Sequence, residues 1–433
     1  MTRPRYGWYG DDFTGATDTL ATLASAGLRA TLFMGVPSSA QLEEAGPLDA
    51  VGIAGAARAM DPAAMRAELD PVGRFFAALG PAVLHYKCCS TFDSAPNVGS
   101  IGAAIQVLQS HVPNGFVPIV GGQPSLGRFC AFSTLFAAAG TGGEMFRIDR
   151  HPTMSRHPVT PMCEADLRRH LALQGLPAIA AIHHPTYATG LEAALDELPP
   201  ASAVLLDVMN EADLAAIGEA IWRHATELPL LAVGSSSVAQ AMVKAWKLGT
   251  PTQDAYGLPP AEGPVLILAG SLSPVTRRQV AAATEFHHVA IDAERLTDDT
   301  AYSARTAAHM ADQLRSGRHV LAYTAADGMP MKPTHATAVA QATARLLATV
   351  LDQIPLRRVG IAGGDTSSRA VQMLDLWGLS HVATLAPGVA VCRTHSANPR
   401  RHGIELMLKG GQMGHSGLFD GFIGGEFAIQ LAN

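Results

Sequence analysis

Short apolar runs alternate with helix-length amphipathic segments along the whole chain. The runs include "LRATLFMGV", "DAVGIAGA" and "PAVLHYKCC" early in the chain, and "PVLILAGS" and "RRVGIAGG" later. Between them lie segments such as "THATAVAQATARLLATVLDQI", in which apolar residues recur with the spacing of a helix. This alternation is typical of βα units, so we predict an α/β fold with largely parallel sheets.

One segment interrupts this pattern. Lys247 to Pro264, "KLGTPTQDAYGLPPAEGP", carries four prolines and little periodicity, as linkers do. A chain of 433 residues suits two or three domains of roughly 100–200 residues each. We therefore predict an N-terminal domain over residues 1–247 and a C-terminal domain over residues 262–433.

Composition narrows the class of protein. A net charge of −6 without a block of basic residues argues against a nucleic-acid partner. The sequence has no apolar stretch of about 18 residues that would span a membrane, and its first residues do not resemble a signal peptide. The five cysteines are scattered, and the 17 histidines show no metalloprotease-type spacing. We expect a reduced, cytoplasmic protein without a transition-metal site. The sequence does not determine the oligomeric state, and a homo-oligomer is one of the states it allows.

The stretch "YGDDFTGATDTL" places three carboxylates where a strand passes into a helix. They are Asp11, Asp12 and Asp18, and Asp18 shares a helical face with Thr14 if the helix begins there. Carboxylates accept hydrogen bonds from hydroxyl groups, so the group suits a polyhydroxylated ligand. The alternative is that Asp12 or Thr14 caps the helix and Asp18 is solvated.

Three later stretches each run from strand to small-residue turn to helix. They are "LLAVGSSSVAQAMV", "LILAGSLSPVTRRQV" and "RVGIAGGDTSSRAVQML". Free N–H groups at such helix starts can bind phosphate, although glycine and serine also serve simply as turn and cap residues. None of the three is a Walker A loop, and no dinucleotide motif stands at a strand end. The candidate phosphate-binding residues in the last two turns are Ser271, Ser273, Gly363, Gly364, Asp365 and Thr366.

A fourth glycine-rich stretch, "LMLKGGQMGHSGLFDGFIGG", lies near the end of the chain. Lys409 precedes Gly410 and Gly411 directly after a short apolar run. A lysine beside flexible backbone can act as a point charge on phosphate, and the alternative is a solvated lysine at a turn.

Several of these stretches together resemble one family, the four-carbon acid sugar kinases, which includes threonate, erythronate and 3-oxo-tetronate kinases. The similar stretches are, in the family's order, "DDFTGATD", "HPVTPM", "GSLSPVT", "GGDTS", "APGV" and "KGGQMG". The resemblance implies an N-terminal acid-sugar-binding domain and a C-terminal nucleotide-binding domain. It also implies ATP as the phosphate donor and Mg²⁺ as its metal.

The stretch from Lys87 to Gly99, "KCCSTFDSAPNVG", departs from the family pattern K-x-D-S-T-L-R-G-N-x-G. Lys87, Ser90 and Thr91 match it, but Cys89 replaces the aspartate and Asp93 replaces the arginine. Arginine is the natural bidentate partner of a carboxylate, so another basic group must meet the acid of the substrate. This pattern is most similar to the 3-oxo-isoapionate kinase branch, which acts on a branched, oxidised acid sugar.

The segment "RIDRHPTMSRHPVTP", from Arg147 to Pro161, is the expected source of that basic group. Its candidates are Arg150 and Arg156, together with two histidines, His151 and His157. The alternative is a surface loop with incidental charges.

The resemblance and the residue types together give each site residue an expected role. Asp12 is the expected base or hydroxyl anchor, with Asp365 as its rival, and Lys87 neutralises charge on the substrate or on the transferring group. The expected substrate-binding residues are Asp11, Thr14, Asp18, Ser90, Thr91, Asp93, Arg150 and Arg156.

The leading functional hypothesis is an ATP-dependent kinase of a small acid sugar. One alternative is an aldolase or isomerase of phosphorylated sugar acids, whose glycine turns would bind the phosphate of the substrate. Another is a periplasmic-type sugar-binding protein with two α/β domains. Detection of nucleotide binding separates the first hypothesis from the other two.

Overall fold

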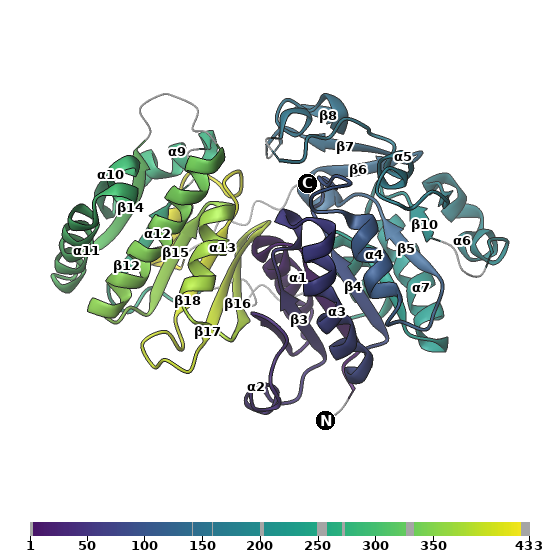
Figure 1. Ribbon diagram of the computed structural model, residues 1–433, viewed down its shortest axis with the longest axis horizontal. Helices are drawn as coiled ribbons and strands as arrows, with labels where there is room; N and C mark the ends of the chain where they lie inside the picture. Colours follow the sequence, from purple (N-terminus) through teal and green to yellow (C-terminus); the bar gives the residue numbers. More distant parts are fainter. Residues whose placement is uncertain are drawn as a thin grey trace. The chain divides into compact units, whose positions relative to one another are not determined.

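The computed structural model describes residues 3–140, 142–157, 159–199, 203–248, 258–270, 273–325 and 333–425. The chain divides into two compact units, Met1–Thr250 and Pro251–Asn433. Each unit mixes helices with mostly parallel strands, which confirms the predicted α/β class (Figure 1). Most of the proline-rich segment Lys247–Pro264 lies outside the described residues.

A parallel sheet forms the centre of the N-terminal unit. Its strands follow the order β2-β3-β1-β4-β11-β5-β10-β9, and each neighbouring pair runs parallel. Strands β1, β3 and β11 are buried along their full length, as expected for a parallel sheet covered on both faces. The strands are β1 (Tyr6–Gly10), β2 (Ala30–Phe33), β3 (Ala50–Ala54), β4 (Val83–Lys87), β5 (Val117–Val120), β9 (Ile179–Ile182), β10 (Ala203–Leu206) and β11 (Leu230–Gly234).

Helices connect these strands and cover the sheet. Helices α3 and α4 pack side by side (Figure 1). Helix α7 packs against α8. Because each crossover returns the chain to the same end, the carboxyl ends of all the parallel strands share one edge. The helices are α1 (Phe13–Ser25), α2 (Ser39–Ala45), α3 (Pro62–Leu79), α4 (Ile101–Gln109), α5 (Leu167–Ala172), α6 (Tyr187–Asp196), α7 (Glu211–Glu227) and α8 (Ser237–Ala245).

A small antiparallel sheet is inserted between β5 and β9. It consists of β6 (Arg128–Ala131), β7 (Thr134–Ala138) and β8 (Met145–Arg147). Asp207, directly after β10, ties it to the parallel sheet, since its carboxylate accepts the N–H groups of Phe132 at 2.7 Å and of Ser133 at 3.0 Å. The two 3₁₀ turns Ile148–Arg150 and Met154–Arg156 follow β8.

The sheet of the C-terminal unit follows the order β13-β14-β12-β15-β18-β17-β16. It is parallel from β13 to β18, whereas β17 runs antiparallel to both of its neighbours, β18 and β16. The strands are β12 (Val265–Ala269), β13 (Phe286–Asp292), β14 (His319–Ala325), β15 (Arg358–Ala362), β16 (Gly378–Ala386), β17 (Val389–His395) and β18 (Glu405–Lys409).

The helices of this unit pack on its sheet in two groups. Helices α11, α12 and α13 lie side by side, and α9 contacts α14, whose Phe419 and Phe422 are buried in the core. In the parts of the chain that the structure describes, no helix is both long and apolar enough to cross a bilayer. The helices are α9 (Pro274–Ala282), α10 (Ala293–Asp298), α11 (Thr300–Arg315), α12 (Pro333–Gln353), α13 (Gly364–Met373) and α14 (Leu418–Gly424).

Candidate active site

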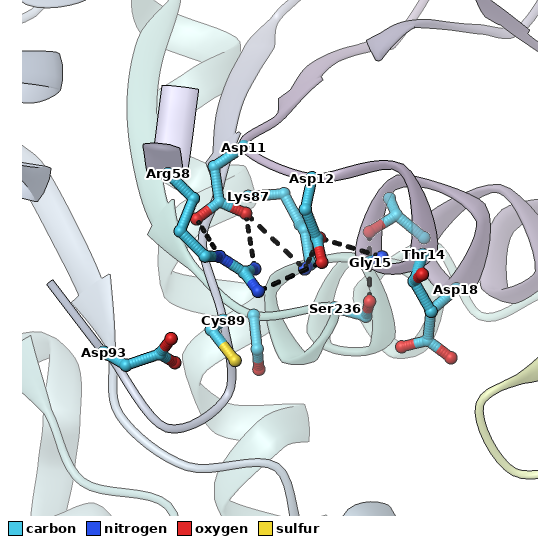
Figure 2. A network of polar contacts seen from close by, with 12 residues as sticks. Asp11, Asp12, Thr14, Gly15, Asp18, Arg58, Lys87, Cys89, Asp93 and Ser236 are labelled. Carbon is cyan, nitrogen blue, oxygen red and sulfur yellow. Dashed lines mark hydrogen bonds and ion pairs between the residues drawn. The ribbon is translucent and has the colours of Figure 1, made fainter. Parts of the chain in front are cut away.

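Four charged side chains meet at the carboxyl ends of three neighbouring strands in the N-terminal unit (Figure 2). Asp11 and Asp12 follow β1, Lys87 is the last residue of β4, and Arg58 comes shortly after β3. We call these four residues the charge quartet. Its members are far apart in the sequence and meet because β3, β1 and β4 are adjacent in the sheet.

Arg58 joins both aspartates of the quartet. Its guanidinium donates to Asp11 through two parallel contacts, Nε to Oδ2 at 3.1 Å and Nη2 to Oδ1 at 2.8 Å. Its Nη1 lies 3.0 Å from Oδ2 of Asp12. Such a bidentate contact fixes the orientation of both groups more firmly than a single ion pair does.

Lys87 completes the quartet. Its Nζ lies 3.3 Å from Oδ1 of Asp12 and 4.0 Å from Oδ1 of Asp11. The lysine side chain and Asp11 are almost completely buried, whereas a quarter of the Asp12 side chain remains exposed. Of the two aspartates, Asp12 is therefore the one that a ligand can reach.

Asp12 also caps helix α1. Its backbone is extended, and its Oδ1 accepts the N–H of Gly15 at 2.9 Å. The capping alternative raised by the sequence is therefore correct for Asp12. Capping uses one of the two carboxylate oxygens and leaves Asp12 free to serve a ligand as well.

The charges of the quartet stabilise one another. Burial alone would raise the pKa of Asp12, but Arg58 and Lys87 outweigh it and lower that pKa to about 2. Burial would likewise lower the pKa of Lys87, but Asp12 and Asp11 outweigh it and raise that pKa. Asp12 and Lys87 therefore both stay charged at neutral pH.

The other two predicted residues of α1 differ in their surroundings. The carboxylate of Asp18 accepts a hydrogen bond from Gln123 Nε2 at 3.2 Å, so it is not simply solvated. Thr14 Oγ1 is buried and has no hydrogen-bond partner among the residues that the structure describes. Buried hydroxyl groups usually have a hydrogen-bond partner, so Thr14 is an exception within the described part of the chain.

The loop after β4 carries the residues that depart from the family pattern. Asp93 is buried and accepts a hydrogen bond of 2.5 Å from Thr91 Oγ1, which also lies 3.0 Å from Cys89 Sγ. Burial raises the pKa of Cys89 to about 11, so the residue is a neutral thiol. Ser90 is half-buried in the same loop. The replacement of aspartate by Cys89 thus removes a charge, and Asp93 supplies one nearby.

Arg58 is the site residue that the sequence analysis missed. It follows the apolar run "DAVGIAGA" within the small-residue stretch "AARAM". An arginine just after a predicted strand was the available signal. The sequence does not show which strands are neighbours in the sheet. Arg58 could therefore be assigned to the site only once β3 was known to lie next to β1.

In the Arg147–Pro161 segment, the two histidines form hydrogen bonds within the loop, whereas Arg150 and Arg156 are exposed. His151 is buried, and its Nδ1 accepts the N–H groups of Thr153 and Met154, at 3.1 Å and 3.2 Å. His157 binds Thr160 in a similar way, with its Nδ1 3.1 Å from the backbone nitrogen. The two histidines therefore use Nδ1 to shape the loop.

Arg150 and Arg156 end the two 3₁₀ turns after β8 and are both exposed. Neither forms an ion pair with another described residue, whereas Arg147 is paired with Asp149. No contact among the described residues joins either arginine to the charge quartet. Since both side chains are exposed and form no ion pair within the described parts of the chain, an anionic ligand can approach them.

In the C-terminal unit, Lys409 ends β18 and is fully buried. Its Nζ donates to Thr276 Oγ1 at 3.1 Å, and that hydroxyl donates to the carbonyl of Gly411 at 2.9 Å. Ser273 caps α9 by accepting the N–H of Thr276 at 3.1 Å. Burial lowers the pKa of Lys409 to about 8, so the solvated-lysine alternative is wrong.

Three glycine turns come together at the carboxyl ends of β12, β15 and β18. The N–H of Gly270 donates to the carbonyl of Ala362, and the N–H of Gly363 donates to that of Lys409, both at 2.9 Å. A Cβ atom on Gly270 would lie 2.2 Å from Thr366 Oγ1, so this position tolerates only glycine. Gly363 has a φ of 128°, which also favours glycine.

Gly364, the first residue of α13, is exposed and differs from the other turn glycines. A Cβ atom added there would meet no atom within 4 Å from the described residues beyond its chain neighbours and its own helix. This open space at a helix start, next to the strand that carries Lys409, fits a phosphate group. Ser271 and the side chain of Asp365 lie outside the described parts of the structure, and Gly410 accepts the N–H of Met413.

Comparison with known proteins assigns the two halves of the chain to one family. Residues 6–242 match the model of a sugar-binding N-terminal domain, and residues 266–419 match that of a nucleotide-binding C-terminal domain. The chain therefore belongs to this family of two-domain proteins, and the predicted resemblance to the four-carbon acid sugar kinases is confirmed.

The similar curated proteins are kinases. A 3-oxo-isoapionate kinase of Paraburkholderia graminis is 38% identical over 95% of this chain and 92% of its own length. The 3-oxo-tetronate kinases of Methylobacterium radiotolerans and Cupriavidus necator are 31% and 29% identical over 95% and 96% of this chain, and over 97% and 96% of their own. These relatives support the kinase hypothesis over the aldolase or isomerase and the sugar-binding-protein alternatives.

Two solved structures share the fold of this chain. A protein from Salmonella typhimurium LT2 shares 26% identity, with a TM-score of 0.80 over 96% of this chain and 98% of its own. One from Haemophilus influenzae, 23% identical, has a TM-score of 0.72 over 98% of this chain and 100% of its own. The second likeness establishes the fold alone.

Proposed function

We propose that this protein transfers the γ-phosphate of ATP to a hydroxyl group of a small, branched 3-oxo acid sugar, 3-oxo-isoapionate or a close analogue. The proposal depends on one observation, the charge quartet with its single accessible carboxylate, Asp12. The 38% identity to a 3-oxo-isoapionate kinase supports this choice of acceptor. The domain at residues 1–247 binds the acid, and the domain at residues 262–433 binds the nucleotide.

Asp12 receives the attacking hydroxyl group. Its Oδ1 is occupied by the N–H of Gly15 and the ammonium of Lys87, whereas Arg58 is the one polar contact of its Oδ2 among the described residues. A carboxylate oxygen has two lone pairs, so Oδ2 can accept one more hydrogen bond. The hydroxyl of the acceptor takes that place and is oriented for attack on the γ-phosphate.

The low pKa of Asp12 is compatible with this role. A carboxylate whose pKa is about 2 is a weak base but is fully ionised at neutral pH. Phosphoryl transfer passes through a loose transition state in which orientation and charge stabilisation matter more than early removal of the proton. Lys87, held beside Asp12, supplies positive charge close to the attacking oxygen.

Asp93 selects the acceptor. The resemblance places an arginine at this position in related kinases, and an aspartate would repel the carboxylate of a substrate by roughly 4 kcal/mol at a separation of about 4 Å. One Asp93 oxygen accepts from Thr91, so the other can accept from an extra hydroxyl group, such as that of a branched substrate. The acid group of the substrate binds Arg150 and Arg156, which are both exposed and form no ion pair with another described residue.

The nucleotide binds to the glycine turns of the C-terminal domain. Lys409 and the helix starts at Ser273 and Gly364 provide positive charge and N–H groups for its phosphates. When bound with ATP, magnesium would neutralise charge on the phosphates. No three His, Cys, Asp or Glu residues cluster as metal ligands in the described parts of the chain.

The test is a coupled ADP-release assay of 3-oxo-isoapionate, 3-oxo-tetronate, D-threonate and D-erythronate. The wild-type protein should prefer the branched 3-oxo acid. Asp93→Arg should lower the activity on the branched 3-oxo acid and favour the plain four-carbon acids. Arg156→Ala should raise the KM of the acid but not that of ATP. Faster turnover of D-threonate or D-erythronate than of any branched or 3-oxo acid would refute the proposed selectivity.

A further inference from the structure

The residue before Asp93 has an unusual backbone conformation. Phe92 is completely buried and has a φ of 53°, in the left-handed region that residues other than glycine rarely adopt. Such a conformation is strained and persists only where the surroundings enforce it. The orientation of Asp93 depends directly on this peptide, so the groups that hold Phe92 also place the Asp93 carboxylate.

A buried polar network holds the Phe92 carbonyl. It accepts hydrogen bonds from the hydroxyl of Ser94 at 2.9 Å and from Nε2 of His170 at 3.1 Å. The same Nε2 also lies 2.9 Å from Ser94 Oγ and 3.0 Å from Gln174 Nε2. In the tautomer that carries the hydrogen on Nε2, the imidazole donates to the Phe92 carbonyl. Gln174 Nε2 donates to Ser94 Oγ at 2.8 Å, so the hydroxyl has a donor as well as an acceptor.

The network connects the loop to two helices. His170 lies on α5 and Gln174 follows that helix, while Gln174 Oε1 accepts the N–H of Ile101 at 2.8 Å, at the start of α4. The side chains of Ser94, His170 and Gln174 are all buried. Burial also lowers the pKa of His170, so its imidazole is neutral and keeps this hydrogen-bond pattern at neutral pH. The contacts leave the loop little freedom to move.

We propose that His170 and Gln174, acting through Ser94 and the Phe92 carbonyl, are positioning residues that fix Asp93 and so determine which acid sugar is accepted. The inference rests on the proposed function, in which Asp93 binds the additional hydroxyl group of a branched acceptor. His170 does not touch the acceptor. A misplacement of about 1 Å at a binding group can change the rate by on the order of 10²-fold, so a distant network can set selectivity.

The test compares two substitutions of His170. His170→Phe keeps a ring of similar volume but removes the donor, whereas His170→Gln keeps an N–H donor at the position of Nε2. We expect His170→Phe to lower the preference for 3-oxo-isoapionate over 3-oxo-tetronate, measured as the ratio of kcat/KM values, by roughly 10–100-fold. His170→Gln should restore most of the preference, and the KM of ATP should stay within about twofold in both.

Gln106 offers a matched control. It also joins α4 to the end of α5, since its Nε2 donates to the carbonyl of Gly175 at 3.0 Å, but it is exposed and does not reach the Asp93 loop. Gln106→Met should leave the acid preference unchanged. If His170→Phe fails to fold, Ser94→Ala removes one of the two donors to Phe92 with a smaller loss of volume and should lower the same ratio.

The outcomes separate this inference from the proposed function. If the wild-type protein phosphorylates none of the acids, the proposed function itself fails. If it is a kinase but His170→Phe and Ser94→Ala lower thermal stability or kcat equally for both acids, with an unchanged ratio, the network is only structural. A changed ratio in Gln106→Met as well would also contradict a specific role for His170.

Discussion

The ammonium group of Lys87 occupies the space that any side chain at Gly15 would need. A Cβ atom on Gly15 would lie 1.5 Å from Lys87 Nζ and 2.5 Å from Asp12 Oδ1. Gly15→Ala must therefore displace the lysine from Asp12. We expect kcat with the acid sugar to fall by on the order of 10²-fold or more, because the displaced charge no longer lies beside the attacking oxygen.

Gly35→Ala provides the control for this experiment. A Cβ atom at Gly35 meets no atom within 4 Å, so the substitution adds a methyl group without a clash. Its kcat should equal that of the wild type. A normal kcat in Gly15→Ala would contradict this prediction, because it would show that turnover does not require Lys87 to lie beside Asp12.

Loss of Arg58 should destabilise the protein as well as inactivate it. Arg58→Met leaves Asp11, which is almost completely buried, without its bidentate partner. Removal of one partner from a buried ion pair typically costs about 3–5 kcal/mol. Denaturant unfolding should show a loss of this size, and the coupled assay should show little or no activity.

The pair of Arg29 and Asp49 is a matched control for Arg58. It has the same bidentate geometry, with contacts of 3.0 Å and 3.1 Å, but the Arg29 side chain is largely exposed. Exposed pairs contribute about 0–1 kcal/mol, so Arg29→Met should unfold almost as the wild type does. Equal effects of the two substitutions would contradict a special role for the charge quartet.

The glycine turn at the start of α13 can be tested without disturbing the fold. Because no atom lies within 4 Å of a Cβ at Gly364, Gly364→Leu should fold normally and place its side chain where we expect a phosphate group. Calorimetry should show that ADP binding is lost while the melting temperature is retained. Unchanged ADP affinity would show that the nucleotide does not bind at this turn.

The catalytic carboxylate is tested by comparing two substitutions. Asp12→Asn keeps the helix cap, since asparagine also accepts a backbone N–H, but it removes the charge next to Lys87 and Arg58. We expect kcat to fall by about 10²–10⁴-fold with ATP affinity nearly unchanged. If Asp12→Asn retains activity within a few-fold while Asp365→Asn is inactive, the base belongs to the nucleotide-binding domain.

Nucleotide affinity should depend on pH through Lys409. Its pKa of about 8 means that the free protein carries the ammonium charge below pH 8 and loses it above. ADP affinity measured by calorimetry should therefore fall by up to about tenfold between pH 7 and pH 9. Lys409→Met should bind more weakly and show no such dependence. An equal fall in both proteins would assign the titration to another group.

The sequence predicted much of the local structure correctly. The α/β class was predicted from the alternation of apolar runs and amphipathic segments. A short apolar run indicates a buried strand, and apolar residues three or four positions apart indicate a helix. The cap at Asp12 and the turns at Gly363 and Gly364 are also local, since each depends on residues within one turn of chain. These features needed no knowledge of the tertiary structure.

The tertiary structure decided which groups meet. Strand order brings Arg58 to Asp11 and Asp12, because β3 lies next to β1 although 47 residues separate Arg58 from Asp11. Burial decided between the two interpretations of Lys409 that the sequence left open, because the folded chain encloses its ammonium group. Both effects depend on contacts between distant segments, which a pattern of neighbouring residues does not record.

The same division applies to the loop that carries Asp93. The sequence alone identified Asp93 as a departure from the family pattern, because that judgement needs only the order of residues. The support from His170, 78 residues away from Phe92, came only from the packing of α5 against the loop. A hydrogen bond depends on distance and angle in space, so only the folded chain determines which donor reaches the Phe92 carbonyl.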